Sequence, residues 1–294
     1  MLKGRLGLET ARIPHADRHG LLWLVRGKLL VKNGTLLFKT AGYKDLDHGV
    51  YSIPFQTVSL ILLGPGCSIT HDVLRLLARH GTGLIVTGEA GVRFYASMPF
   101  GRDDSTLARK QVMAWSGKSG SRVSIARRMY AWRLGEIFPD ADMDVLRGME
   151  GARAKTLYKR MAEKYDVHWH GRRYDRNNPT ATDIPNQAIN HAATAVEGAA
   201  MIAVAATSTL PQLGFIHEDS GISFCLDIAD LFRDKIILPV AFRATNHYNK
   251  NRGKNIESLT RRIAGDTMQE QKLIPEMIDR IKKLFDGIPT KEEP

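Results

Sequence analysis

The chain changes its pattern of apolar residues once, near residues 98–105, and this change limits the folds that it can adopt. Before it, apolar runs are short, and Asn33-Gly34 between two of them predicts a hairpin. After it, long segments carry apolar residues at helical spacing. We therefore expect an α+β fold, with an N-terminal β-sheet domain of β-sandwich-like form followed by a larger all-α C-terminal domain.

The domain boundaries follow from the same change of pattern. We expect an N-terminal β-rich domain at residues 1–98, a C-terminal α-helical catalytic domain at 105–286 and a flexible tail at 287–294. The β-rich domain should contain one inserted helix, HDVLRLLARH. Thr70 precedes it as an N-cap residue, and Gly81 follows it as a residue suited to end a helix.

The second domain should be built around one apolar helix. Helices are expected at STLARKQVMAW, SRVSIARRMYAWRLGEIF, VLRGMEGARAKTLYKRMAEKY, IPNQAINHAATAVEGAAMIAVAATS and near 224–234 and 270–286. The fourth of these is rich in alanine and nearly all apolar towards its end, which is typical of a buried central helix.

The charge of the chain is strongly positive and unevenly placed. The net charge is +11, of which residues 1–100 contribute +6, residues 101–200 contribute +5 and the remainder nothing. A polyanion is the natural partner for such a surface, because each neutralised phosphate releases counterions. A basic surface with no partner is the alternative.

Composition also limits the cellular compartment that we expect for the protein. The chain has two cysteines, Cys67 and Cys225, too few for a disulfide scaffold or a four-cysteine zinc site. No stretch approaches the roughly 18 consecutive apolar residues of a membrane span. We therefore expect a cytoplasmic protein with no membrane partner.

The stretch GFIHEDSGISFCLDIADLFR is the best candidate for a catalytic site. Asp227 and Asp230 lie three residues apart on an otherwise apolar helix, so they share one face. His217 lies ten residues upstream, in a turn. Two carboxylates and an imidazole suit Mg²⁺ or Mn²⁺. Alternatively, the two acids pair with Arg233 and Lys235.

Glu150 is the second candidate. It lies in the middle of an expected helix between Gly148 and Gly151, and such glycines cost about 1 kcal/mol each relative to alanine. They indicate close approach of a ligand or of another helix; in the second case Glu150 simply faces solvent. The His168-x-His170 pair has no close third ligand and is interpreted as two exposed loop histidines.

With these residues in view, the chain resembles the CRISPR adaptation integrase, the first-numbered Cas protein family, in its type I-E branch. The resemblance covers nearly the whole chain. It is carried by LLGPGCSITHDVLRLLARHGTGLIVTGEAGVRFYAS, LRGMEGARAKTLY, HWHGRRYD with the Asn-Gln helix after it, and GFIH…SFCLDIADLFR.

The resemblance implies an activity and a site. The implied activity is a divalent-metal-dependent DNA integrase and endonuclease, which inserts short DNA duplexes into the CRISPR array by 3′-hydroxyl attack on a phosphodiester of the repeat. The implied ligands of Mg²⁺ or Mn²⁺ are Glu150, His217 and Asp230, with Asp227 beside them as a further catalytic acid. The implied partners are protospacer and leader-repeat DNA, a second copy of the chain in a homodimer, and the second-numbered Cas protein.

The resemblance also implies DNA contacts. Arg93 in the GEAGVR block matches a basic position of the family, and Arg233 follows Asp230 by three residues. Weaker candidates are Arg172, Arg173, Arg261 and Arg262. Relatives in this branch can carry a tyrosine that ends the duplex part of the captured DNA where this chain has Arg26. Residues 244–257 do not align and carry no expected contact.

Two other functions fit the same residues. One is a nucleic-acid-binding scaffold of the same fold whose acids are structural. The other is a metal-dependent nuclease of RNA or branched DNA. Loss of strand transfer on substitution of Glu150, His217 or Asp230 separates the integrase from both.

Overall fold

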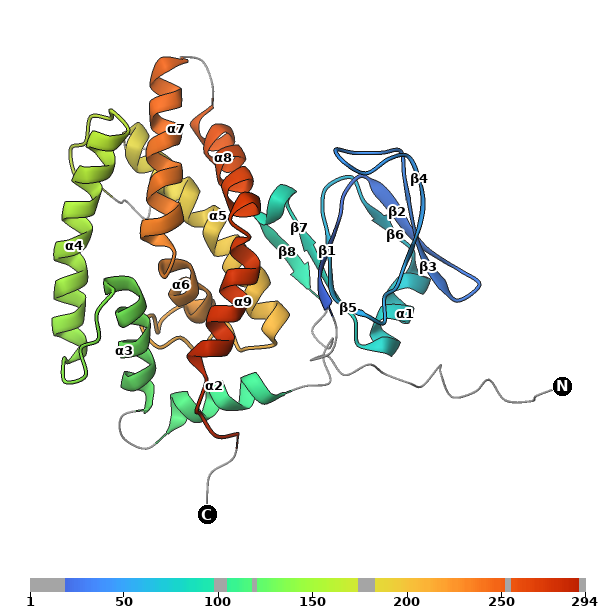
Figure 1. Ribbon diagram of the computed structural model, residues 1–294, viewed down its shortest axis with the longest axis horizontal. Coiled ribbons are helices and arrows are strands. Elements are labelled where there is room, and N and C mark those ends of the chain that lie inside the picture. The colour runs from blue at the N-terminus through green and yellow to red at the C-terminus, as the bar shows by residue number, and fades with distance from the viewer. Residues whose placement is uncertain (1–18, 98–104, 118–120, 174–182, 252–254, 291–294) are drawn as a thin grey trace. The chain divides into compact units, whose positions relative to one another are not determined.

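The structure is a computed structural model that describes residues 19–97, 105–117, 121–173, 183–251 and 255–290. It divides into a β-rich unit, Met1–Glu89 with Phe94–Ser105, and a helical unit, Ala90–Arg93 with Thr106–Pro294 (Figure 1). Strands precede helices, so the expected α+β fold is confirmed. The expected junction at 98–104 lies outside the described residues.

The β-rich unit contains two sheets, each of four strands among its described residues. The first has the order β1 (His19–Leu24), β5 (Val58–Leu63), β7 (Gly83–Thr87) and β8 (Phe94–Ser97). The second has the order β4 (Gly49–Ile53), β3 (Thr35–Thr40), β2 (Gly27–Lys32) and β6 (Ser68–Ile69). Leu29 and Phe38 from one sheet share a core with Leu63 and Leu84 from the other, as a β-sandwich requires.

The local predictions in this unit are largely confirmed. The Asn33-Gly34 turn joins β2 to β3, and both residues have the positive φ of a two-residue hairpin turn. Helix α1 spans His71–His80 and ends at Gly81, whose φ of 63° is left-handed. Thr70 occupies the N-cap position, as predicted, although its side chain makes no capping hydrogen bond.

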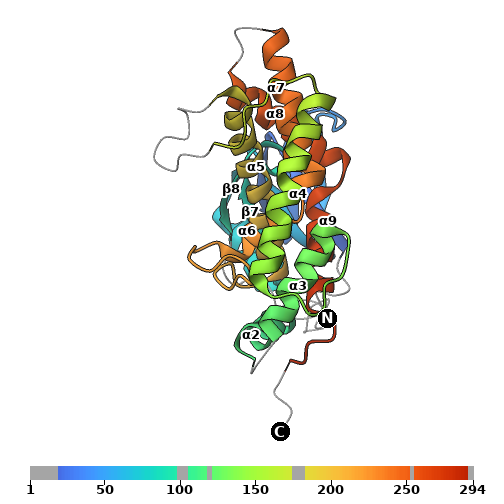
Figure 2. The same cartoon turned by 90° about the vertical axis from the view of Figure 1, so that its left-hand side faces the viewer.

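The helical unit is arranged around α5 (Ile184–Thr207), which packs against α6, α7, α8 and α9 (Figure 1). The other helices are α2 (Thr106–Ser116), α3 (Ser121–Leu134), α4 (Met143–Lys164), α6 (Ser223–Asp230), α7 (Leu238–Lys250), α8 (Ile256–Glu270) and α9 (Leu273–Leu284). By composition α5 could cross a membrane, but 61% of its apolar window is buried in the unit, as in a core helix. Both views show α4 on the outside of this unit (Figures 1 and 2).

The sequence interpretation missed two helices, α7 and α8, between the expected helices near 224–234 and 270–286. Helix α7 carries Pro239 in its first turn, where a proline is tolerated, and then runs into the polar stretch ATNHYNK. The expected 224–234 helix is instead α6 followed by a π-helical turn, Arg233–Ile237. Such turns are rare and are frequent at functional sites.

Candidate active site

Asp227 organises the loop that leads into α6. Its side chain is completely buried. One carboxylate oxygen accepts from the backbone N–H groups of Phe215 and Ile216 at 2.6 and 3.1 Å, and the other accepts from that of His217 at 2.9 Å. Three consecutive N–H groups aimed at one carboxylate form an anion-binding turn, which stabilises the charge of this buried acid.

The loop can form only because residue 214 is glycine. A Cβ at Gly214 would lie 2.3 Å from the His217 carbonyl oxygen and 2.7 Å from the Ser223 Cβ. The Ser223 hydroxyl closes the next turn, since it donates to the Ser220 carbonyl at 2.8 Å and accepts from the Ser220 N–H at 3.1 Å. The pattern Gly-Phe-Ile-His followed by Ser-x-x-Ser therefore forms a loop whose conformation is fixed by its own hydrogen bonds.

Asp227 also fixes the imidazole of His217. The His217 Nδ1 lies 2.7 Å from the second Asp227 oxygen, so Nδ1 carries a proton, and in the neutral imidazole Nε2 keeps its lone pair. Nε2 in turn lies 3.9 Å from the Asp230 Oδ2. The hydrogen bond to Asp227 raises the pKa of His217, although burial opposes it. An imidazole oriented by a carboxylate through Nδ1 is the usual form of a metal-ligating histidine.

Glu150 and Asp230 share one cation, Arg133 from α3. The Arg133 Nη2 lies 2.6 Å from the Glu150 Oε1, and its Nη1 lies 3.7 Å from the Asp230 Oδ2. The Arg133 side chain is only 8% exposed. The sequence interpretation missed this residue, although an arginine between the buried Tyr130 and Leu134 on one helix was a signal for a partly buried charge.

Asp230 has a second cation on its other side. The Arg233 Nη1 lies 3.1 Å from the Asp230 Oδ1, and its Nη2 donates to the Tyr158 hydroxyl at 3.0 Å. The alternative pairing of the two acids with Arg233 and Lys235 is therefore right only for Asp230 with Arg233. Lys235 instead pairs with Glu276 at 2.6 Å.

Glu197 is a further acid of this region that the sequence interpretation did not single out. It is the one carboxylate on α5, a helix that is otherwise largely apolar. Burial raises its pKa, and the nearby charge of Asp230 raises it further, while Arg93 and Arg233 oppose the shift. A lone acid inside an apolar helix was the signal that could have identified it.

The glycines beside Glu150 face open space. Cβ atoms built at Gly148 and Gly151 would meet nothing within 4 Å. The helix-packing explanation for these glycines is therefore wrong for the described residues, and approach by a ligand remains the prediction.

The donor set suits Mg²⁺ or Mn²⁺ in chemistry, because it contains two carboxylates and an imidazole that, when neutral, offers its Nε2 lone pair. The geometry is not that of a closed ligand cage. In the part of the chain that the structure describes, no group of three or more histidine, cysteine, aspartate or glutamate side chains is arranged to hold a metal ion. Glu150 and Asp230 are nevertheless already placed about one shared positive charge, that of Arg133. The donor chemistry therefore suits a divalent cation, whereas in the described geometry an arginine lies between the two carboxylates.

The expected DNA-binding arginines differ in how they are held. Arg93 lies 3.6 Å from the Glu257 Oε1, which also pairs with Arg261 at 3.7 Å. The Arg172 guanidinium donates to the side-chain oxygens of Asn186 and Asn190 at 2.9 and 2.7 Å. Arg173 donates its backbone N–H to the same Asn186 oxygen, and Arg262 is exposed.

Arg26 is part of a stacked pair in the β-rich unit. Its guanidinium lies 4.5 Å from the centre of the Tyr43 ring. The Tyr43 hydroxyl donates to the Glu89 Oε1 at 2.8 Å, and this hydrogen bond raises the pKa of Tyr43. An aromatic ring, that of Tyr43, therefore lies beside Arg26, the position at which relatives can carry a tyrosine.

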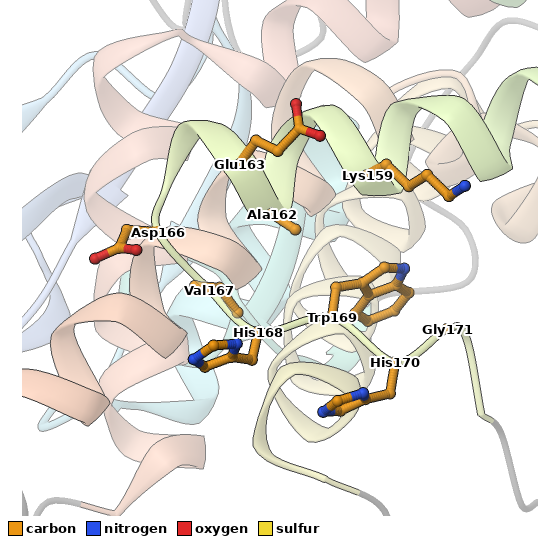
Figure 3. A pocket seen from close by; sticks show the side chains of 9 residues that line it. All are labelled: Lys159, Ala162, Glu163, Asp166, Val167, His168, Trp169, His170 and Gly171. Carbon is orange, nitrogen blue, oxygen red and sulfur yellow. The ribbon is translucent and has the colours of Figure 1, made fainter.

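The two histidines after α4 lie at the rim of a pocket of 620 Å³ (Figure 3). His168 and His170 are exposed, as the sequence predicts. Trp169 between them turns inward and stacks on Tyr158 at 5.1 Å. The stack links this pocket to Asp230 through Tyr158 and Arg233.

Three kinds of comparison agree on the relatives of this chain. Residues 133–277 match the family model described as "CRISPR associated protein Cas1". A CRISPR-associated endonuclease Cas1 from Clostridium sp. SY8519 is 36% identical over 252 residues, which cover 84% of this chain and 81% of the relative. The endonuclease of the same name from Escherichia coli K12 is 33% identical over 266 residues, covering 90% of this chain and 85% of that protein.

Solved structures share the fold. A TtCas1–DNA complex superposes with a TM-score of 0.81 at 30% identity and covers 92% of this chain and 98% of that one. A casposase bound to an integration product superposes with a TM-score of 0.64 at 14% identity, covers 91% of this chain and 96% of that one, and shows the fold alone.

Proposed function

Because this chain belongs to the Cas1 family of CRISPR-associated proteins, we propose that it is a metal-dependent DNA integrase and endonuclease of CRISPR adaptation. Its curated relatives are named CRISPR-associated endonucleases, which supports a nuclease role. We place it in the type I-E branch on the GEAGVR-YAS and RG-EG-R motifs of its sequence. The observation that carries the proposal is the oriented His217, whose Nε2 lies beside the Asp230–Arg133–Glu150 cluster.

The proposed reaction is a transesterification. The 3′-hydroxyl of an incoming DNA strand attacks a phosphorus of the repeat, a new P–O bond forms, and the old bond to the leaving 3′-oxygen breaks. The attacking hydroxyl loses a proton and the leaving oxygen gains one, so atoms and charge balance. One phosphodiester replaces another, and no nucleoside triphosphate is needed.

Each residue of the cluster has a part in this proposal. Glu150, His217 and Asp230 would hold Mg²⁺ or Mn²⁺, which neutralises charge on the transferring phosphoryl group. Asp227 holds the His217 imidazole in the tautomer that offers Nε2. Arg133 would give up Glu150 and Asp230 to that cation and bind a phosphate oxygen of the substrate instead.

The partners belong to the same proposal. A DNA complex of a relative with the same fold supports DNA as the substrate, and Arg93, Arg172, Arg173, Arg233 and Arg262 are the proposed phosphate contacts. A homodimer and a larger complex with the second-numbered Cas protein would then act on leader-repeat DNA in the cytoplasm.

One observation favours a second candidate function, a nucleic-acid-binding scaffold. Arg133 neutralises the two acids in the described geometry, and its short distance to Glu150 is that of a stable ion pair. In a scaffold the cluster would stabilise the fold and no metal would bind.

A strand-transfer assay distinguishes these functions. The protein and its partner are mixed with labelled duplex DNA and a supercoiled plasmid that bears a leader and repeat, in Mg²⁺, Mn²⁺ or EDTA. We expect metal-dependent joining that His217→Ala, Glu150→Ala and Asp230→Ala each abolish while duplex binding persists. Binding without joining in every metal would support the scaffold. Cleavage without joining would support the nuclease of RNA or branched DNA.

A further inference from the structure

The loop that carries His217 is held from two sides, and only one of them is the Asp227 carboxylate. On the other side lies α2. Gln111 of α2 is completely buried. Its Nε2 donates to the carbonyl oxygens of Leu210 and Leu213 at 2.9 and 3.0 Å, and its Oε1 accepts from the Leu210 N–H at 2.7 Å.

These three hydrogen bonds engage both ends of the Gln111 amide, since its NH₂ group donates twice and its oxygen accepts once. Both partners of Nε2 are carbonyl oxygens, which only accept, and the partner of Oε1 is an N–H, which only donates, so the orientation of the amide is fixed. A glutamate of the same length would offer no donor to the two carbonyls, and a methionine would offer neither donor nor strong acceptor. The residue type therefore matches the loop backbone closely.

Two more contacts continue this support towards His217. Trp115, one turn further along α2, donates its Nε1–H to the Gly214 carbonyl at 3.1 Å. Arg122 lies over the Trp115 ring at 5.4 Å and pairs with Glu218, the residue after His217, at 2.5 Å. The α2 contacts thus follow the loop from Leu210 to the neighbour of the histidine.

The loop is tightly packed, so a displacement of residues 210–214 is passed on to His217. The Gly214 Cα lies so close to the His217 carbonyl that not even a methyl group fits between them. A shift of residues 210–214 must therefore move His217 or break its bonds to Asp227. Asp227 fixes the orientation of the His217 imidazole, whereas the α2 contacts fix the position of the loop backbone at residues 210–214.

We propose that Gln111 is a positioning residue for His217, acting together with Trp115 through the loop of residues 210–217. This inference deepens the proposed function and rests on it, because it treats His217 as a ligand of Mg²⁺ or Mn²⁺. Gln111 itself touches neither the cation nor the DNA in this proposal.

The test compares Gln111→Met with the wild-type full-length protein. Binding of Mn²⁺ alone is measured by electron paramagnetic resonance of the free ion, without DNA or turnover. We expect the Mn²⁺ dissociation constant to rise roughly tenfold, the scale seen when a partner that orients a ligand is removed. Strand transfer with the partner protein should fall by a similar factor at low Mn²⁺ and recover at high Mn²⁺, while the KM for duplex DNA stays constant.

A matched control separates positioning from general loss of stability. Asn246 also donates its side-chain amide to a distant backbone carbonyl, that of Tyr165, at 2.7 Å. Asn246→Leu should lower the melting temperature and leave the Mn²⁺ affinity unchanged. If Gln111→Met does not fold, Trp115→Phe removes the bond to the Gly214 carbonyl, keeps an aromatic ring beside Arg122, and should weaken Mn²⁺ binding in the same direction.

The possible outcomes separate the two proposals. A wild-type protein that neither binds Mn²⁺ nor transfers strands overturns the proposed function. A wild type that does both, with Gln111→Met and Trp115→Phe within twofold of its Mn²⁺ affinity, overturns only the positioning role. An equal loss of Mn²⁺ affinity in Asn246→Leu overturns it as well.

Discussion

The candidate site has two halves that are held in different ways. In the loop half, a fully buried Asp227 accepts three backbone N–H groups and the His217 imidazole. In the helix half, Glu150 lies on the outer helix α4 between glycines that face open space, and it pairs with the Arg133 guanidinium. Both halves are held by the chain itself, the first through buried backbone hydrogen bonds and the second through one arginine, which the proposed metal ion would replace. In the proposed function, Glu150 would exchange Arg133 for the metal ion while His217 keeps its position.

The largest effect that would sharpen this comparison is expected at Asp227. Asp227→Ala leaves three backbone N–H groups without their acceptor, and buried unsatisfied donors cost about 1–3 kcal/mol each. We expect the free energy of unfolding, measured in urea, to fall by roughly 3 kcal/mol or more. Asp230→Ala, three residues on and 21% exposed, should cost much less. An equal loss for both would contradict the distinction between a buried organiser and a replaceable ligand.

Glycine-to-alanine changes should have opposite signs in the two halves. Gly214→Ala places a methyl group 2.3 Å from the His217 carbonyl oxygen, and overpacking of this kind costs about 1–3 kcal/mol. Gly151→Ala adds its methyl group where nothing lies within 4 Å, and a helix gains about 1 kcal/mol from this exchange.

Thermal unfolding of both glycine variants tests the comparison directly. Gly214→Ala should melt below the wild type and Gly151→Ala above it. Strand transfer by Gly151→Ala adds a second readout, because DNA that approaches α4 at this point would meet the new methyl group. Unchanged transfer at higher stability would remove ligand approach as the reason for the glycine.

These contrasts explain what the sequence could predict. The spacing of Asp227 and Asp230 on an apolar helix, and the glycines beside Glu150, are local patterns and are visible in the sequence. The contact of Arg133 with Glu150, and of Gln111 with Leu210, joins residues that are distant in the chain, and packing decides it. The division between β-rich and helical parts was predictable for the same local reason, while α7 was hidden by a proline that is harmless in a first turn.

A smaller effect is expected from pH, and it belongs to the loop half. The bond to Asp227 raises the pKa of His217 in the folded chain above its ordinary value of 6.5. The ion pair therefore contributes its full stability below pH 6.5, and this contribution is lost as the pH rises through the raised pKa. In EDTA, the difference in unfolding free energy between the wild type and His217→Asn should shrink from pH 6.5 upwards. A difference that stays constant from pH 5 to 9 would argue against the imidazolium–carboxylate pair.

The smallest effect on stability is expected at Glu257, the carboxylate that Arg93 and Arg261 share. Glu257 lies 3.6 Å from Arg93 and 3.7 Å from Arg261, all three partly exposed, and such pairs contribute about 0–1 kcal/mol. Glu257→Gln should therefore leave stability nearly unchanged and tighten duplex DNA binding modestly, since two guanidinium groups lose a competing anion.

Arg93→Ala should weaken binding and lower the slope of log affinity against log salt by about 1. Fluorescence anisotropy over a salt series measures both, and a slope that Arg93→Ala leaves unchanged would exclude Arg93 as a phosphate contact. If the slope falls, Glu257 holds the Arg93 guanidinium in place until a DNA phosphate binds it, as we propose for Glu150 and Arg133.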